Sequence, residues 1–184
     1  KLGSLKNVND KYFHSKIPTW NNFVSHPDYD VFWQANSPLQ YVRYPQIPQL
    51  HVGGYYDQED INGPQLMYRH LEEKDSFNRN FIVLGPWNHG QWARGNADRL
   101  GNISFNQPTG RWFRALQKKW FDYWLKGEGD GKFEEAHCFQ TGNNEWKTYD
   151  SWPPKDAVMK KLFANADNTA GFDPPGSATA FVSY

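Results

Sequence analysis

The sequence predicts an α/β fold, built on a unit in which two parallel strands flank one helix. Two short apolar runs, Gln49–Tyr56 and Phe81–Leu84, have the length and composition of buried strands. Between them, residues 61–74 carry four apolar side chains at the spacing of one helix face: Pro64, Met67, Tyr68 and Leu71. Because the carboxyl ends of parallel strands meet at one edge of a sheet, the residues that follow these two strands should lie close together.

The composition bears on the class of partner. The 184 residues include 20 Lys and Arg and 20 Asp and Glu, so no net charge indicates nucleic acid and no basic run indicates a membrane surface. Aromatic residues make up 17% of the chain, with 9 Trp, which indicates a saccharide- or aromatic-binding surface or a core of large rings. The single cysteine, Cys138, excludes an internal disulfide framework. We expect a small-molecule substrate and leave open a homo-oligomer.

The two ends of the chain bear on its location. The sequence contains no apolar stretch of membrane length and no signal peptide, and it begins with Lys1 rather than Met. We therefore expect a fragment or a processed piece of a longer protein. In such a piece the missing signal carries little weight, and we expect a periplasmic or secreted location.

Outside the central unit, the sequence predicts further helices and strands. Pro27 is expected in the first turn of a short helix. Thr109 is expected to cap a helix that runs to about Lys126 and stops at Gly127. Short β-type runs with turn signals lie between Phe133 and Tyr149 and between Val158 and Ala164, as at the start of an all-β sandwich.

Two residues at the predicted strand ends are suited to acid–base chemistry. Asp57 follows the first strand, and His89 follows the second within Gly85-Pro-Trp-Asn-His-Gly90. An acid and then a histidine on successive strand ends is the order found in the second half of a Ser-His-Asp triad. The alternatives are an Asp57 that only caps the next helix and a His89 that only makes local hydrogen bonds in its loop.

Two further acids, Glu59 and Asp60, place three carboxylates within four positions at one strand end. Acids at a helix N-terminus interact favourably with the helix dipole, which is one explanation. The other is a bound ammonium group, because neighbouring acids would raise the pKa of Asp57 unless a cation lies nearby. The residues alone leave both explanations open.

The sequence contains no Gly-x-Ser-x-Gly motif, and neither Ser4 nor Ser177 lies between a predicted strand and helix. We therefore expect the nucleophilic serine to lie upstream of Lys1. No His, Cys and Asp cluster has metal-ligand spacing, so we predict no metal and no cofactor.

Several stretches occur in one order along nearly the whole chain: His26–Gln34, Tyr56–Asp60, Gly85–Gly90, Phe121–Gly127, and Thr141–Trp146 with Trp152-Pro153. Together they resemble the α-amino acid ester hydrolase family, also known as the glutaryl-7-aminocephalosporanic acid acylase-like family. This family is related to cocaine esterase and to the X-Pro dipeptidyl-peptidases.

The resemblance implies the C-terminal part of an α/β-hydrolase domain with a helical cap, followed by a jelly roll. Residues 1–45 would then be the end of the cap and a linker, 46–130 the last part of the hydrolase domain, and 131–184 the incomplete start of the jelly roll. By motif match, Asp57 is the triad acid and His89 the base, and Glu59 and Asp60 match members of a carboxylate cluster that binds the substrate ammonium.

The function implied is that of a serine hydrolase that cleaves esters and amides of α-amino acids, including β-lactam side chains. The piece alone, without its serine, should be inactive. One alternative is an X-Pro dipeptidyl-peptidase. The other, from a different class, is a non-catalytic carbohydrate-binding or assembly module.

Overall fold

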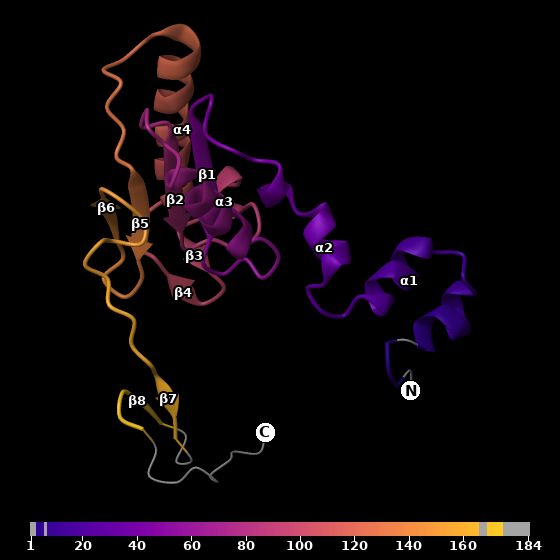
Figure 1. Cartoon of the computed structure of the whole chain (residues 1–184). Helices are drawn as coiled ribbons and strands as arrows, with labels where there is room; N and C mark the ends of the chain where they lie inside the picture. Colours follow the sequence, from indigo (N-terminus) through magenta and orange to yellow (C-terminus); the bar gives the residue numbers. More distant parts are fainter. Residues whose placement is uncertain (1–2, 6, 166–168, 175–184) are drawn as a thin grey trace.

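The computed structural model describes residues 3–5, 7–165 and 169–174. The chain starts with an arm of short helical elements that extends away from the sheet (Figure 1). Along the chain these are a π-helical turn η1 (Asn9–Phe13), α1 (Pro18–Ser25), α2 (Val31–Asn36) and a 3₁₀ turn η2 (Pro38–Gln40).

The short helix expected at Pro27 begins later than predicted. Helix α2 starts at Val31, and Asp30 caps it by accepting a hydrogen bond from the Phe32 N–H at 2.9 Å. The other oxygen of Asp30 bonds His26 Nδ1 at 2.6 Å. Because Asp30 supplies a side-chain cap that Pro27 lacks, the helix starts after the acid rather than at the proline.

The predicted βαβ unit is present. Strand β1 (Gln49–Gly54) and strand β2 (Asn80–Gly85) run parallel, with Gly54 opposite Gly85 at their carboxyl ends. Helix α3 (Asn62–Glu72) connects them. Strand β2 is buried along its whole length, as its uninterrupted apolar run predicted.

The structure differs from the sequence prediction at β5 (Ala136–Gln140) and β6 (Glu145–Tyr149), expected to begin a separate sandwich. The described strands form a four-stranded sheet in the order β1-β2-β5-β6, in which β5 runs parallel to β2 and β6 returns antiparallel. Residues 136–149 therefore belong to the same sheet as Asp57 and His89. Small side chains on β5, Ala136 and Cys138, pack in one buried cluster with Tyr68, Ile82 and Leu84.

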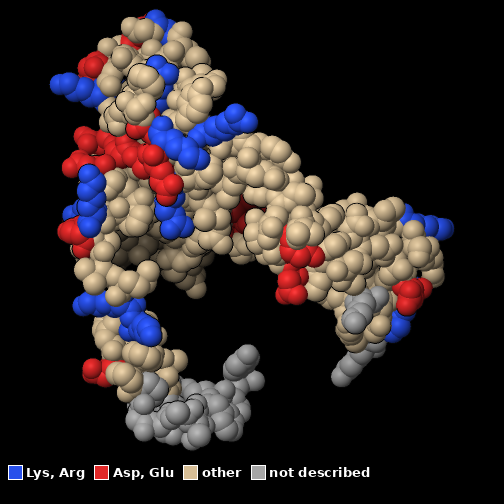
Figure 2. Space-filling model, viewed as in Figure 1, with Lys and Arg blue, Asp and Glu red and all other residues tan. Residues whose placement is uncertain are grey.

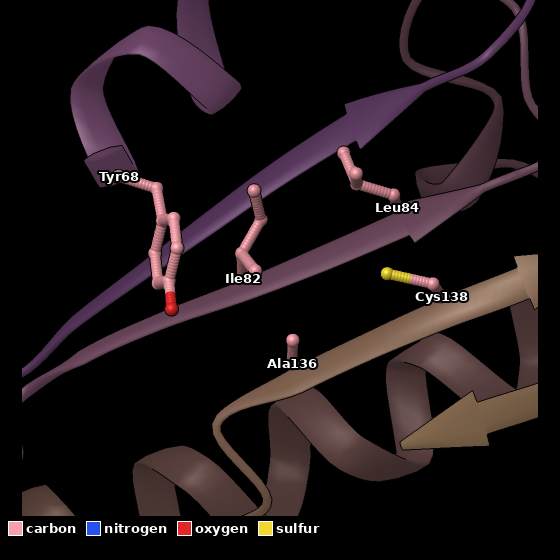
Figure 3. Close-up of a cluster of buried hydrophobic side chains, with 5 residues drawn as sticks. All are labelled: Tyr68, Ile82, Leu84, Ala136 and Cys138. Carbon is pink, nitrogen blue, oxygen red and sulfur yellow. The ribbon is translucent and has the colours of Figure 1, made fainter. Parts of the chain in front are cut away.

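Helices cover the two faces of this sheet. One face buries Ile82 and Leu84 of β2 against Tyr68 of α3 and the small side chains of β5 (Figure 3). On the other face, Val83 packs with Phe113 of α4 (Thr109–Lys126). The alternation of β2 side chains thus gives each helix its own apolar cluster.

Helix α4 confirms the predicted bounds but not the predicted cap. Gly127 ends the helix in a left-handed conformation with φ +73°, as expected of a C-terminal glycine. Thr109 is the first helical residue and makes no capping bond; its hydroxyl instead donates to the Ala97 carbonyl. The hydroxyl is therefore committed to the loop before the helix.

The remaining described elements are short. They are η3 (Gln91–Ala93), a small hairpin of β3 (Arg99–Leu100) and β4 (Ile103–Ser104), and a second of β7 (Phe163–Ala164) and β8 (Ala170–Gly171). Part of the segment expected to begin the jelly roll, 166–168 and 175–184, lies outside the described residues. No helix in the described ranges has the length and apolar character needed to cross a bilayer.

Candidate active site

The carboxyl ends of β1 and β2 remain paired beyond the strands themselves. The Tyr55 N–H donates to the Gly85 carbonyl at 2.9 Å, and the Tyr56 N–H donates to the Trp87 carbonyl at 3.0 Å. Asp57 follows directly, and His89 lies two residues beyond Trp87. The two loops that carry the predicted acid and base therefore leave the sheet side by side.

The predicted acid and base meet. His89 Nδ1 lies 3.2 Å from Asp57 Oδ2, across 32 positions of sequence. The Asp57 side chain is 1% exposed, whereas the His89 side chain is 55% exposed. The pair thus joins a fixed, buried carboxylate to a histidine that remains accessible at the edge of the sheet.

The second oxygen of Asp57 explains how the carboxylate is held. Asp57 Oδ1 accepts hydrogen bonds from the Glu59 N–H at 2.9 Å and the Asp60 N–H at 3.0 Å. These bonds form a turn around Asp57 and do not cap α3, which begins at Asn62 after Ile61 and has no side-chain cap, so the alternative in which Asp57 only caps the next helix is wrong. Oδ1 receives the backbone N–H groups, and Oδ2 faces the imidazole.

These contacts determine the charge of Asp57. Burial raises the pKa of the carboxyl, but the backbone N–H groups of Asp60 and Glu59 and the His89 ring lower it, and the pKa ends below its ordinary value. From the sequence alone, the neighbouring acids would raise the pKa of Asp57 unless a cation lay nearby. Backbone N–H groups and His89 already do so, which removes that reason for expecting a bound ammonium.

The His89 loop is fixed on its other side by polar contacts. Gly90 adopts φ +67°, which a residue without Cβ tolerates. The Asn88 N–H donates to Gln91 Oε1 at 3.1 Å, and the Arg94 guanidinium donates to the His89 carbonyl. These contacts hold the loop from residues that the sequence did not single out.

Glu59 and Asp60 take different positions. Asp60 is 64% exposed, and its Oδ2 lies 3.3 Å from His89 Nδ1, so it faces the same ring nitrogen as Asp57. Glu59 is exposed, and its carboxylate has no hydrogen bond or ion pair within residues 3–5, 7–165 and 169–174. Of the two acids, Glu59 is the one whose carboxylate remains free for a ligand.

Asp57, Asp60 and His89 also offer ligand atoms within 4.8 Å of one another, a spacing compatible with a metal ion. Each contact in this group is equally a carboxylate–histidine pairing, and Oδ1 of Asp57 is occupied by backbone donors. The three residues therefore do not by themselves indicate a metal.

The sequence analysis missed a second histidine–acid pair, His26 with Asp30 in the helical arm. Its spacing of four positions was a usable signal. This pair belongs to the cap of α2 and does not approach β1 or β2 through any contact seen among the described residues.

An apolar cavity of about 540 Å³ lies between this arm and the outer side of the βαβ unit, lined by Tyr29, Pro38, Leu39, Leu50, Val52, Pro64 and Met67. Figure 2 shows this part of the surface as hollowed between the arm and the sheet.

Comparisons with known proteins bear on the family that the chain resembles. Residues 4–91 match the X-Pro dipeptidyl-peptidase (S15) family. The cocaine esterase of Rhodococcus sp. (strain MB1 Bresler) is 28% identical over 155 residues, which is 83% of this chain and 26% of that protein. Over residues 4–91 the chain is thus similar to the S15 family. The matched region includes Asp57 and His89.

Two solved structures resemble this chain over nearly its whole length. An aminopeptidase from a marine sediment archaeon, Thaumarchaeota archaeon, has a TM-score of 0.82 and 35% identity, over 94% of this chain and 29% of that one. An α-amino acid ester hydrolase has a TM-score of 0.80 and 28% identity, over 98% of this chain and 31% of that one. The chain thus spans about a quarter to a third of the length of its relatives.

Proposed function

We propose that Asp57 and His89 are the acid and base of a Ser-His-Asp triad in an esterase or acylase acting on α-amino acid derivatives. The observation that carries this proposal is the 3.2 Å contact between His89 Nδ1 and the buried Oδ2 of Asp57. It fixes Nδ1 and leaves Nε2 without a hydrogen bond among the described residues, on a side chain that is 55% exposed and that a serine from another part of the complete protein would approach.

In this mechanism His89 Nε2 takes the proton of the serine hydroxyl as it attacks the substrate carbonyl, and returns it to the leaving group. Asp57 keeps the proton on Nδ1 and stabilises the imidazolium that forms. Because the pKa of Asp57 is lowered, the carboxylate remains ionised while His89 gains and loses its proton. The leaving group departs and an acyl-serine remains. His89 then takes a proton from the attacking water and returns it to the serine oxygen, which releases the acid.

The experiment is active-site labelling of the complete protein with a fluorophosphonate. We expect one labelled serine, and loss of labelling in His89→Ala. The matched control is His70→Ala, because His70 lies on α3 and bonds the Val42 carbonyl, away from the site. Labelling that persists in His89→Ala would refute the triad.

For the substrate, we propose an ester or amide whose α-ammonium is bound by Glu59, with Asp60 beside it. The similarity to an α-amino acid ester hydrolase and to an aminopeptidase supports a substrate with a free amino group. The exposed, unpaired carboxylate of Glu59 supports it independently. A charge-assisted hydrogen bond contributes about 1.5–3 kcal/mol, or roughly 10- to 150-fold in binding.

Glu59→Gln tests the substrate class. We expect KM for an amino-acid ester to rise about 10-fold or more, while KM for the matching acetyl ester, which has no ammonium, stays within about twofold. Glu73→Gln, at the far end of α3, is the control. An equal change on both esters would show that Glu59 does not bind the ammonium.

A peptidase is the second candidate, favoured by the S15 match of residues 4–91 and by the similarity to an aminopeptidase. It would use the same acids to bind a peptide N-terminus. Faster turnover of an X-Pro anilide than of an amino-acid ester would favour it.

A carbohydrate-binding or assembly module gains no support. All nine Trp lie in described ranges, and each is buried or half-buried rather than exposed. A saccharide platform needs exposed aromatic faces. Retention of the chain on insoluble polysaccharide would nevertheless restore this alternative.

At the level of architecture, we propose that the arm is the end of a helical cap and that the sheet is the last part of an α/β-hydrolase domain. Since β5 and β6 join the sheet, we propose that any jelly roll starts after residue 150. A periplasmic or secreted location is part of the same proposal, and cell fractionation of the complete protein tests it.

A further inference from the structure

One buried residue contacts both loops of the proposed triad. The Trp87 carbonyl accepts the Tyr56 N–H, directly before Asp57, and Trp87 itself lies two residues before His89. Its side chain is fully buried. The position of Trp87 therefore affects both members of the Asp57–His89 pair at once.

The two strand ends are shaped around this tryptophan. A Cβ on Gly54 would lie 2.2 Å from the Trp87 carbonyl oxygen, and one on Gly85 would lie 2.4 Å from the Trp87 ring. Neither glycine has a positive φ. Close approach of Trp87, rather than backbone freedom, is what requires glycine at both positions.

A hydrogen-bonded relay fixes the indole from the start of α4, on the face of the sheet that α4 covers. Trp87 Nε1 donates to Thr109 Oγ1 at 2.8 Å, and the Thr109 hydroxyl donates to the Ala97 carbonyl. Thr109 is completely buried. Ala97 adopts φ +50°, a left-handed conformation that a residue with Cβ rarely takes. The loop is thus held in a strained form in which its carbonyl meets Thr109.

We propose that Trp87, oriented by the Thr109 hydroxyl, is a positioning residue that sets the separation of Asp57 and His89. This inference rests on the proposed triad. The relay runs from the start of α4 through the indole to the ends of both strands, and Thr109 contacts neither Asp57 nor His89 in any hydrogen bond of the described chain. The Thr109 hydroxyl acts through Trp87, with Trp87→Phe separating this route from the bond to the Ala97 carbonyl.

An ordinary core role predicts something different. Trp87 also packs against Trp92, Phe113 and Trp146 at ring-centroid distances of 5.6–5.7 Å. If packing were its only role, losing the Thr109 hydroxyl would lower the unfolding temperature and leave the turnover of the folded protein unchanged. If Trp87 has a positioning role, losing the Thr109 hydroxyl lowers kcat even in the folded protein.

The test compares Thr109→Val, which keeps the shape and removes the hydroxyl, with Thr109→Ser, which restores it. Thr148→Val, on the exposed side of β6, is the matched control. In the complete protein, well below its unfolding temperature, we expect Thr109→Val to lower kcat for an ester about 10- to 100-fold with KM within twofold. Thr109→Ser and Thr148→Val should retain at least half of the wild-type kcat.

A second readout does not depend on turnover. The proton shared by His89 Nδ1 and Asp57 gives a downfield NMR resonance, and we expect it to broaden or vanish in Thr109→Val but not in Thr109→Ser. If Thr109→Val does not fold, Trp87→Phe removes the same N–H donor and is measured in the same way.

The outcomes separate this inference from the proposed function. A folded Thr109→Val with wild-type kcat and an unchanged resonance would overturn the positioning role, even if His89→Ala is inactive. Persistent labelling in His89→Ala would overturn the triad. In that case the resonance alone would still decide whether Thr109 controls the Asp57–His89 contact.

Discussion

The two ends of the central sheet carry contrasting polar networks. At the carboxyl end of β1 and β2, Asp57 is surrounded by two backbone N–H groups and a histidine. At the opposite end, Glu135 precedes β5 and accepts the Tyr68 hydroxyl at 2.7 Å. Figure 2 shows Asp and Glu side chains gathered in a patch near the start of β5. Both networks join a carboxylate to a ring, but only the first joins a fully buried carboxylate to a largely exposed histidine.

The difference lies in the neighbours of each carboxylate. Burial, together with the Glu72 and Asp75 carboxylates, raises the pKa of Glu135 to about 7, although the Tyr68 hydroxyl lowers it. Around Asp57, backbone N–H groups and His89 outweigh burial and lower the pKa. One end thus keeps a ready negative charge beside an exposed base, whereas the other takes up a proton and holds the sheet together.

The largest expected effect separates the two ends by activity. Asp57→Asn in the complete protein should lower kcat about 10⁴-fold, because the amide cannot keep the proton on His89 Nδ1 in the required tautomer. Glu135→Gln, the matched change at the other end, should leave kcat within about threefold. Esterase kinetics at saturating substrate measure both. Similar losses in the two variants would mean that the ends are not functionally distinct.

A smaller expected effect distinguishes the two ends of the sheet by their contribution to the stability of the fold. Tyr68→Phe removes the hydroxyl that donates to Glu135 and accepts the Trp152 N–H at 3.3 Å. Leaving a buried polar group unpaired costs about 1–3 kcal/mol, so the free energy of unfolding should fall by that amount. Urea denaturation measures it, with Tyr12→Phe on the exposed arm as the control. An unchanged midpoint would show that this network contributes no stability.

The smallest effect is a dependence of stability on pH. The pKa of Glu135 rises from 4.5 to about 7 on folding, so between these values the folded state binds more protons than the unfolded state. The contribution of Glu135 is therefore full below about pH 4.5 and is lost as pH rises through 7. His51, Tyr68, Glu72 and Asp75 face this network from β1, α3 and the following loop.

Calorimetry at pH 5.5 and pH 8 tests this dependence. We expect the unfolding temperature to be a few degrees higher at pH 5.5, and the difference to shrink in Glu135→Gln. Asp57 does not confound the comparison, because its pKa is lowered and its contribution is lost only at more acidic pH. Burial lowers the pKa of His51 and His137, which gives both proteins an opposite dependence on pH, so the assignment is contradicted if the pH difference is the same in wild type and in Glu135→Gln.

Local pattern predicted much of the fold. The uninterrupted run of β2, the helix face that includes Tyr68, and Gly127 as a helix stop are all confirmed. The sheet partner of β5 was not predictable in this way. The pairing of Leu84 with Cys138 is fixed by tertiary packing over a long connection, and a five-residue strand carries no signal of which sheet it joins.

The candidate site likewise has features that the sequence predicted and features that it did not. Chain order and strand ends were enough to predict that Asp57 and His89 meet, and the contact is present. The Asp60 carboxylate beside His89 was not foreseen, because the direction of an exposed side chain depends on the turn around Asp57. Thr109 was assigned to a helix cap, since nothing local reveals that its hydroxyl bonds a tryptophan 22 positions away.

The placement of β5 in the sheet has a practical consequence for dissecting the protein. The exposed stretch from Glu128 to Asp130 has the composition of an interdomain linker and is a natural place to end a shortened polypeptide. A polypeptide ending there would lack both β5 and Trp146, the indole stacked on Trp112 at 3.6 Å. Limited proteolysis at this stretch should therefore yield two pieces that elute together on gel filtration rather than two separable domains.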